Sequence, residues 1–305
     1  MKTLLGKYQN GNYITTIYSD GTKIRETEKD IFIPEFAECI DMQISKRCSN
    51  GCEFCYANCT PDGEVAELKK HKAFFDSLHP YTELAINMNF PLPNDFMWFL
   101  EYMKERNIIV NITINQNDFV RNLSYIHDLV EKNLIYGLGI SWLSSYGTPF
   151  IEIINSFDNA VLHVINGLIS LEDIEYLSDN GFKILILGYK DIGRGINYHK
   201  NKIKEITKNQ QWLYNNLAEV AKKFDVIAFD NLALEQLNVK RLFSDNEWDL
   251  FYSGNDGQYT YYLDLVDETF AINSLANEKY KMLGTTDEMF KIVRLIQITN
   301  DTILN

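Results

Sequence analysis

The sequence predicts an α/β protein built on a partial (β/α) barrel of about six or seven parallel strands, with an N-terminal β-hairpin and a small C-terminal extension. Two observations support this fold class. Short apolar segments recur after residue 37, mostly about 25 residues apart, which leaves room for the helix that each parallel βαβ unit needs. In addition, no Gly-x-Gly-x-x-Gly follows a strand, so a dinucleotide-binding sheet has less support than a barrel.

The first expected element is a β-hairpin in residues 11–27. Apolar and polar residues alternate there around Asp20-Gly21, a dipeptide that suits a type I′ turn. Seven strands of near-continuous apolar residues follow, as is typical of parallel strands covered by helices. We expect these strands at residues 39–45, 83–88, 108–114, 135–141, 160–165, 182–188 and 224–230.

The helices between the strands carry recognisable ends. Asn94 is a candidate cap for the helix over 95–103, and Ser170 with Asp173 resembles a capping box. A single apolar stripe predicts one helix over 119–131.

On this pattern the chain divides into three parts. We expect the hairpin appendage in residues 1–36, the barrel in 37–241 and the C-terminal extension, packed on the barrel, in 242–305. Within the extension, residues 259–272 resemble a hairpin or an extended pair of strands.

Composition restricts the class of protein. The 305 residues are 46% apolar and carry a net charge of -13, which is typical of a globular protein and opposes binding to bulk nucleic acid. No secretion signal and no apolar run of about eighteen residues is present, so we expect a cytoplasmic protein that does not enter a membrane. A small molecule, nucleotide or peptide fits better as a substrate.

The cysteines are clustered. All five, Cys39, Cys48, Cys52, Cys55 and Cys59, lie within 21 residues, which indicates metal binding in a reducing compartment rather than a disulfide framework. The middle three form C-x3-C-x2-C directly after the first expected barrel strand, where barrel enzymes build their sites. A [4Fe-4S] cluster held by three cysteines leaves one iron open for a ligand.

This loop resembles the signature of the radical S-adenosylmethionine (SAM) superfamily, C-x3-C-x-aromatic-C, at Cys48, Cys52, Phe54 and Cys55. The resemblance extends over residues 37 to 231 as strand and helix order. It implies a [4Fe-4S] cluster on the three cysteines, SAM bound at the open iron, and an external electron donor such as flavodoxin or ferredoxin. It also implies reductive cleavage of SAM and abstraction of a hydrogen atom from a small-molecule or nucleotide substrate.

Three other interpretations of the cysteines stay open. Structural zinc and a closed four-cysteine cluster would both use Cys59 as a fourth ligand, whereas the radical SAM interpretation makes it a bystander. The third is a non-catalytic iron-sulfur protein derived from the same fold, with weak or lost SAM binding. Cys39 is expected to pack in or beside the first barrel strand.

One segment departs from the family pattern. Where the family has a Gly-Gly-Glu-like stretch that receives the SAM amino group, this chain has Asn87-Met88-Asn89-Phe90. Phe90 cannot accept a hydrogen bond, and Met88 adds bulk, so Asn87 and Asn89 are the candidate replacements.

Further candidates lie at the ends of later strands. Lys190 and Arg194 offer cations for a carboxylate or phosphate, Asp230-Asn231 offers a substrate contact or a helix cap, and His163 is more typical of a core histidine. Together with Phe54 of the motif, the cofactor-binding candidates are Phe54, Asn87, Asn89, Thr113, Asn115, Ser141, Asn166 and Lys190.

Overall fold

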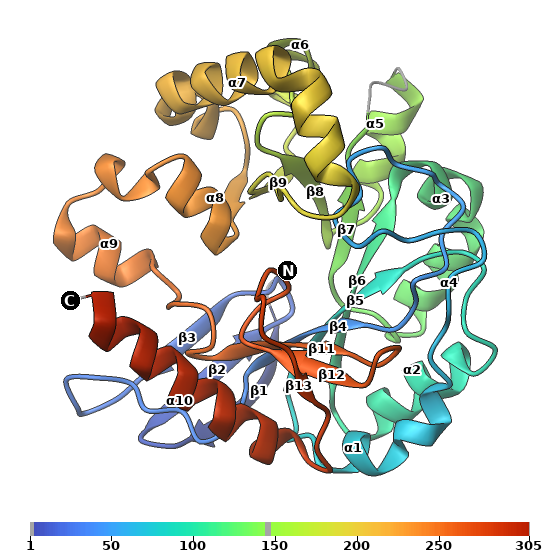
Figure 1. The fold of residues 1–305 in the computed structure, drawn as a ribbon, viewed down its shortest axis with the longest axis vertical. Coiled ribbons are helices and arrows are strands. Elements are labelled where there is room, and N and C mark those ends of the chain that lie inside the picture. Colours follow the sequence, from blue (N-terminus) through green and yellow to red (C-terminus); the bar gives the residue numbers. More distant parts are fainter. Residues whose placement is uncertain (1–2, 144–147, 305) are drawn as a thin grey trace.

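The computed structural model describes residues 3–143 and 148–304. Its centre is a ten-stranded sheet in the order β10-β9-β8-β7-β6-β5-β4-β11-β12-β13 (Figure 1). All seven expected strands are present in it, and neighbours among them are parallel. They are β4 (Cys39–Gln43), β5 (Glu83–Met88), β6 (Ile109–Asn115), β7 (Leu138–Ser141), β8 (Ala160–Ile165), β9 (Lys183–Leu187) and β10 (Val226–Phe229).

The C-terminal segment belongs to this sheet. β11 (Thr260–Asp264) pairs in parallel with β4, so eight strands in the described residues run parallel rather than the six or seven expected. β12 (Thr269–Ala271) then returns antiparallel, followed by β13 (Tyr280–Lys281). The hairpin expected in 259–272 is therefore confirmed, but it extends the main sheet because it covers the edge of β4 that would otherwise be unpaired.

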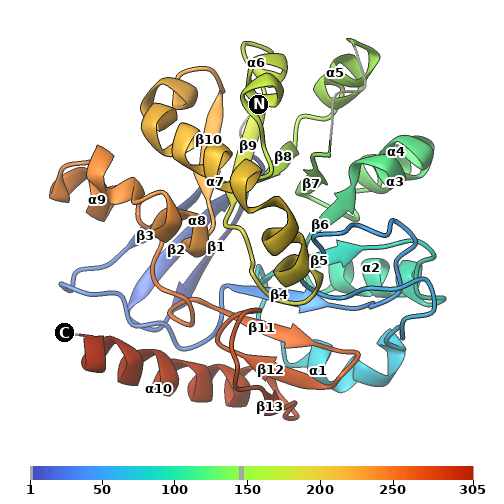
Figure 2. The same ribbon diagram turned by 45° about the horizontal axis from the view of Figure 1, so that its top comes forward.

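The helices surround the outside of the curved sheet (Figures 1 and 2). They are α1 (Lys72–Asp76), α2 (Phe96–Glu105), α3 (Gln116–Arg121), α4 (Leu123–Glu131), α5 (Thr148–Asn155), α6 (Leu171–Leu177), α7 (Arg194–Ala221), α8 (Asn231–Gln236), α9 (Asp245–Phe251) and α10 (Thr286–Leu304), with short 3-10 turns η1 (Leu68–His71) and η2 (Val239–Leu242). The sheet stays open in the described residues, since β10 and β13 form its two edges. No described helix combines the length and the apolar character needed to cross a membrane.

Two of the predicted helix ends need correction. The capping box of Ser170 and Asp173 is confirmed at the start of α6. The cap of α2, however, is Asp95 rather than Asn94, and the Asp95 carboxylate accepts a hydrogen bond from the backbone of Lys69 in η1 instead of capping its own helix. The helix expected over 119–131 is interrupted at Asn122, where α3 ends and α4 begins.

A separate antiparallel sheet precedes the main one. The expected hairpin is confirmed as β2 (Tyr13–Tyr18) and β3 (Lys23–Glu26), and β1 (Leu4–Asn10) adds a third strand. The turn is not type I′. That turn requires a positive φ at both Asp20 and Gly21, and only Gly21 has one, 83°. Tyr18 and Thr22 close a three-residue loop instead, with a backbone hydrogen bond of 3.0 Å.

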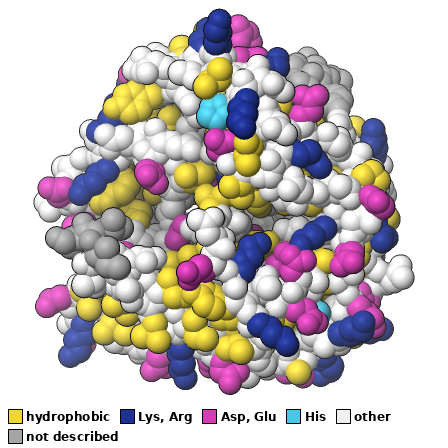
Figure 3. Space-filling view, viewed as in Figure 1, with side chains coloured by type: hydrophobic (Ala, Val, Ile, Leu, Met, Phe, Trp, Pro, Cys, Tyr) yellow, Lys and Arg dark blue, Asp and Glu magenta, His cyan; other side chains and the backbone are white. Residues whose placement is uncertain are grey.

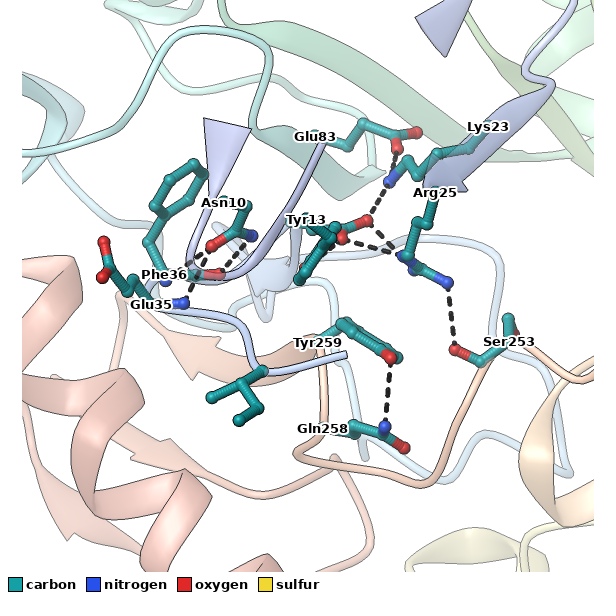
Figure 4. A network of polar contacts seen from close by, with 12 residues as sticks. Asn10, Tyr13, Lys23, Arg25, Glu35, Phe36, Glu83, Ser253, Gln258 and Tyr259 are labelled. Atoms are coloured by element: carbon teal, nitrogen blue, oxygen red, sulfur yellow. Dashed lines mark hydrogen bonds and ion pairs between the residues drawn. The ribbon is translucent and has the colours of Figure 1, made fainter. Parts of the chain in front are cut away.

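Charged groups tie this N-terminal sheet to the amino ends of the parallel strands (Figure 4). The carboxylate of Glu38, 1% exposed, accepts hydrogen bonds from the Tyr13 hydroxyl at 2.6 Å and the Arg25 guanidinium at 2.9 Å. Lys23 lies 3.1 Å from Glu38 and 2.6 Å from Glu83. Burial opposes the charge of Glu38, but Arg25 and Lys23 outweigh it and lower its pKa.

The two faces of the parallel sheet differ in character. In β5, Leu84, Ile86 and Met88 are 2% exposed or less and pack in the core, whereas Ala85 and Asn87 point the other way and stay half-buried. The same alternation in β6 turns Asn111, Thr113 and Asn115 toward the inner face. This inner face is therefore polar and open, which places potential ligand contacts inside the curve of the sheet.

Candidate functional site

The cysteine motif lies on the loop that follows β4. The loop is held by backbone hydrogen bonds from Cys48 to Thr60 at 2.9 Å and from Thr60 to Lys46 at 3.0 Å. The thiols of the motif, Cys48, Cys52 and Cys55, are half-buried. The loop thus presents three sulfurs at the carboxyl end of the sheet, the end where parallel α/β folds place their sites.

Side-chain amides contact two of these sulfurs. Asn50 lies 3.4 Å from the Cys48 sulfur and also donates to the Asp118 carboxylate at 2.6 Å, which fixes its orientation. Asn115, at the end of β6, has its amide nitrogen 3.8 Å from the Cys52 sulfur. Hydrogen bonds of this kind stabilise the negative charge of a thiolate or of a metal-bound sulfur.

Arg194 ties the cysteine loop to the start of α7. Its side chain donates to the carbonyl of Cys52 at 3.0 Å and to that of Cys59 at 2.9 Å, and its backbone N–H donates to Cys55 at 3.2 Å. The neighbouring Gly193 has a φ of +58°, and a Cβ there would lie 2.3 Å from the carbonyl oxygen of Tyr56. The sequence GRG therefore lets the two loops approach closely.

The thiols differ in their tendency to ionise. A hydrogen bond from the Cys59 thiol lowers the pKa of Cys55 to about 5, and the pKa of Cys59 is raised as the donor of that bond. Burial, with the neighbouring thiols, raises the pKa of Cys52. Cys39 is the first residue of β4, as expected, and burial raises its pKa.

The donor set fits an iron-sulfur cluster. Three half-buried thiols share one loop, two of them face amide donors, and the guanidinium of Arg194 lies against the loop backbone. Taking the described residues alone, no three His, Cys, Asp or Glu side chains meet where they could hold a single metal ion.

The segment after β5 differs from the expectation. Met88 is fully buried on the core side of the sheet, so it adds no bulk to the inner face, and Phe90 packs edge-on against Tyr125. Both polar groups of Asn87 are used by the segment directly after β4, because its carbonyl accepts from the Ile44 N–H at 3.2 Å and its amide donates to the Ser45 carbonyl at 3.0 Å. Asn89 has no side-chain hydrogen bond within the described chain.

The remaining candidates are brought together only in part. Asn87 aligns with Thr113 across β5 and β6, and Asn115 aligns with Ser141 across β6 and β7, so these side chains share the inner face. Asn115 also caps α3 by accepting from Asn117 at 2.9 Å.

Three other candidates lie elsewhere. Phe54 contacts Tyr198 of α7, with ring centroids 5.9 Å apart. Asn166 is 1% exposed and donates to Gln236 of α8 at 3.0 Å. Lys190 enters a different cavity, described below.

Two residues of the inner face were not recognised as candidates. His163 does not behave as a satisfied core histidine: its ring is half-buried, has no hydrogen-bond partner within residues 3–143 and 148–304, and lies over Gly139. Burial lowers its pKa to about 4. Asp41 projects from the middle of β4 into a cavity. The signal available in the sequence was the polar residue within an otherwise apolar strand.

Comparisons with known proteins show the fold alone. No family model matches the sequence, and no curated protein matches it. The fold is similar to that of Streptococcus suis SuiB, solved bound to S-adenosylmethionine, with a TM-score of 0.54 and 14% identity over 86% of this chain and 68% of that chain.

Proposed function

We propose that this chain is a radical SAM enzyme. It would use a [4Fe-4S] cluster on Cys48, Cys52 and Cys55 to cleave SAM reductively and abstract a hydrogen atom from a small-molecule or nucleotide substrate. The partial (β/α) barrel and an external electron donor such as flavodoxin or ferredoxin are part of the same proposal.

The observation that carries the proposal is the position of the C-x3-C-x-aromatic-C loop. It follows the first strand of the seven-strand βα array, at the carboxyl end of the sheet and against the polar inner face. The likeness in fold to SuiB, a protein solved with SAM, supports the same assignment.

The chain's own residues would position the reactants and exclude water. Cys48, Cys52 and Cys55 would ligate three irons, with Asn50 and Asn115 donating toward their sulfurs. A bound cluster supplies the electron that breaks a carbon-sulfur bond of SAM, which releases methionine and the radical that abstracts hydrogen. The inner-face groups Thr113 and Ser141, and Asn89 directly after β5, are available to orient SAM.

The test is electron paramagnetic resonance of the anaerobically reconstituted, dithionite-reduced protein, with and without SAM. We expect about four irons per chain, a cluster signal that changes when SAM is added, and release of 5′-deoxyadenosine. Cys59→Ser should retain the iron and the signal, whereas Cys52→Ser should lose both. Loss of the cluster in Cys59→Ser would indicate closed four-cysteine ligation instead.

One observation favours a second candidate, a non-catalytic iron-sulfur protein of the same fold. Asn87 uses both of its polar groups to bind the backbone of Ile44 and Ser45 after β4, and Phe90 stands where the family has the acidic residue that binds the SAM amino group. A cluster signal that does not respond to saturating SAM would support this alternative.

A further inference from the structure

A cavity of about 150 Å³ lies inside the curve of the sheet, beside the cysteine loop. Segments distant in sequence line it: β4, the loop after β9, the start of α8, β11 and the loop after β12. The curve brings these segments together, since Asn231 after β10 donates to Asp256 before β11 at 2.6 Å. The residues used below are Asp41, Lys190, Asp230, Asp256 and Ser274.

Two opposite charges face this cavity without meeting. Asp41 and Lys190 influence each other's ionisation, yet no ion pair of 4 Å or less joins them, and the Asp41 carboxylate has no hydrogen-bond partner in the described part of the chain. Lys190 donates to the Ser274 hydroxyl at 3.0 Å and is also hydrogen-bonded to Tyr56, which leaves one N–H donor of its ammonium group for a ligand. An acceptor and a donor are thus held apart across an open space.

The other carboxylates of the cavity are already engaged by the fold. Asp230 accepts backbone hydrogen bonds from Gly188 at 2.9 Å and Ala233 at 2.7 Å with one oxygen. Asp256 accepts from Asn231 and Asn273, both at 2.6 Å. Because the fold already uses these two acids as hydrogen-bond acceptors, Asp41 is the carboxylate of the cavity that stays available to a cationic ligand group.

Tyr56 links the cavity to the cysteine loop. It follows Cys55 directly, and the Lys190 ammonium lies 4.0 Å from the centroid of its ring. A molecule held between Asp41 and Lys190 would therefore lie next to the loop that carries the motif.

We infer that this cavity binds a small zwitterion of the amino-acid type, with its ammonium group on Asp41 and its carboxylate on Lys190. The inference rests on the proposed function, because it makes this zwitterion the substrate or the recognised part of the substrate. It also changes the role of Lys190 from a cofactor contact to a substrate contact. The volume suits a single amino acid or one end of a longer molecule.

The experiment is saturation-transfer NMR, which detects binding as magnetisation passed from the reconstituted protein to a small probe. Three matched probes are used: L-alanine, ethylamine, which lacks the carboxylate, and propionate, which lacks the amine. L-alanine should give the strongest transfer. Asp41→Asn should weaken binding of alanine and ethylamine, and Lys190→Met that of alanine and propionate, each by about tenfold or more. Lys183→Met, at the opposite end of β9, and the exposed Asp225→Asn should change nothing.

Several outcomes would overturn the inference. These are the absence of saturation transfer from L-alanine, and transfer from L-alanine that survives both cavity substitutions. Thermal melts of each variant separate a lost contact from a lost fold. Since the measurement requires no SAM cleavage, a protein that binds alanine but ignores SAM would refute the proposed function alone, and a protein that cleaves SAM but ignores alanine would refute this inference alone.

Discussion

Two acidic side chains, one at the amino end of the parallel sheet and one on its inner face, are treated in opposite ways by the fold. At the amino end, Glu38 is enclosed by Tyr13, Arg25 and Lys23, so each charge has a partner. Three residues further along the chain, Asp41 faces the inner cavity with no hydrogen-bond partner among the described residues. On the outer surface seen in Figure 3, acidic and basic side chains are interspersed and exposed to solvent.

The comparison separates groups that stabilise the fold from groups that are free for a ligand. Removing a charge from water is costly unless hydrogen bonds or opposite charges compensate it. Glu38 has that compensation and its pKa is lowered, whereas burial raises the pKa of Asp41 despite Lys190. A fold that tolerates such an uncompensated group beside a cavity favours a functional interpretation of it.

The largest effect is expected at the paired end. Glu38→Gln leaves Arg25 and Lys23 without their shared carboxylate, and we expect the free energy of unfolding to fall by about 3–5 kcal/mol in urea titrations. The control is Glu67→Gln, which removes an exposed ion pair with Lys70 (2.8 Å) and should cost less than about 1 kcal/mol. Equal losses in the two variants would contradict the comparison.

The same variant gives a pH dependence with a defined sign. Because the pKa of Glu38 is lowered in the folded protein, its contribution is complete above the ordinary glutamate pKa and is lost as pH falls through the lowered value. The difference in unfolding free energy between wild type and Glu38→Gln should therefore narrow only in acid. A difference that narrows between neutral pH and mildly alkaline pH would contradict this assignment.

A smaller effect is expected at the cysteine loop. Arg194→Lys keeps the charge but cannot reproduce both side-chain hydrogen bonds to Cys52 and Cys59. We expect iron loss to a chelator to be about tenfold faster, as the loss of one charged hydrogen bond implies, and the reduction potential of the cluster to shift. Arg241→Lys on η2 is the control, and an unchanged rate of iron loss in Arg194→Lys would show that the contact is dispensable.

How much of the fold could be predicted from the sequence depends on how far apart in the chain the contacting residues lie. Strand positions and the capping box of Ser170 depend on local patterns, and they were predicted correctly. The parallel pairing of β11 with β4 joins residues about 220 apart, and no local pattern contains it. Met88 and Asn87 lie on opposite faces because side chains alternate along β5, and this alternation could be predicted from the sequence. The expectation that Met88 adds bulk at the SAM site came from the resemblance to a glycine-rich segment instead.

The candidate site shows the same limit. The cysteines and Phe54 could be proposed as a site from spacing alone, because the motif is local in sequence. The contacts of Arg194 and the cavity between Asp41 and Lys190 depend on how the curved sheet brings distant loops together. Polar residues inside apolar strands, such as Asp41 and His163, were the available signal for that part of the site.

A still smaller effect, of the opposite sign to that of Glu38, is expected for Asp41→Asn. Burial raises the pKa of Asp41, so its charge opposes folding above that pKa, and the neutral amide removes the penalty. The unfolding free energy at neutral pH should stay constant or rise by less than about 1 kcal/mol, a small value because water in the cavity screens the carboxylate. A clear loss of stability would mean that Asp41 has a structural partner and is not free for a ligand.

The smallest effect at neutral pH is expected for His163→Gln, because the ring is neutral there and makes no hydrogen bond that the substitution would break. Since burial lowers the His163 pKa to about 4, the unfolded chain binds its proton first, and stability should fall as pH drops from the ordinary histidine pKa toward 4. His163→Gln should match wild type in thermal melts at neutral pH and exceed it within that acidic window. An imidazole resonance that titrates at the ordinary histidine pKa in the folded protein would instead place the ring in open water, away from the polar inner face of the sheet.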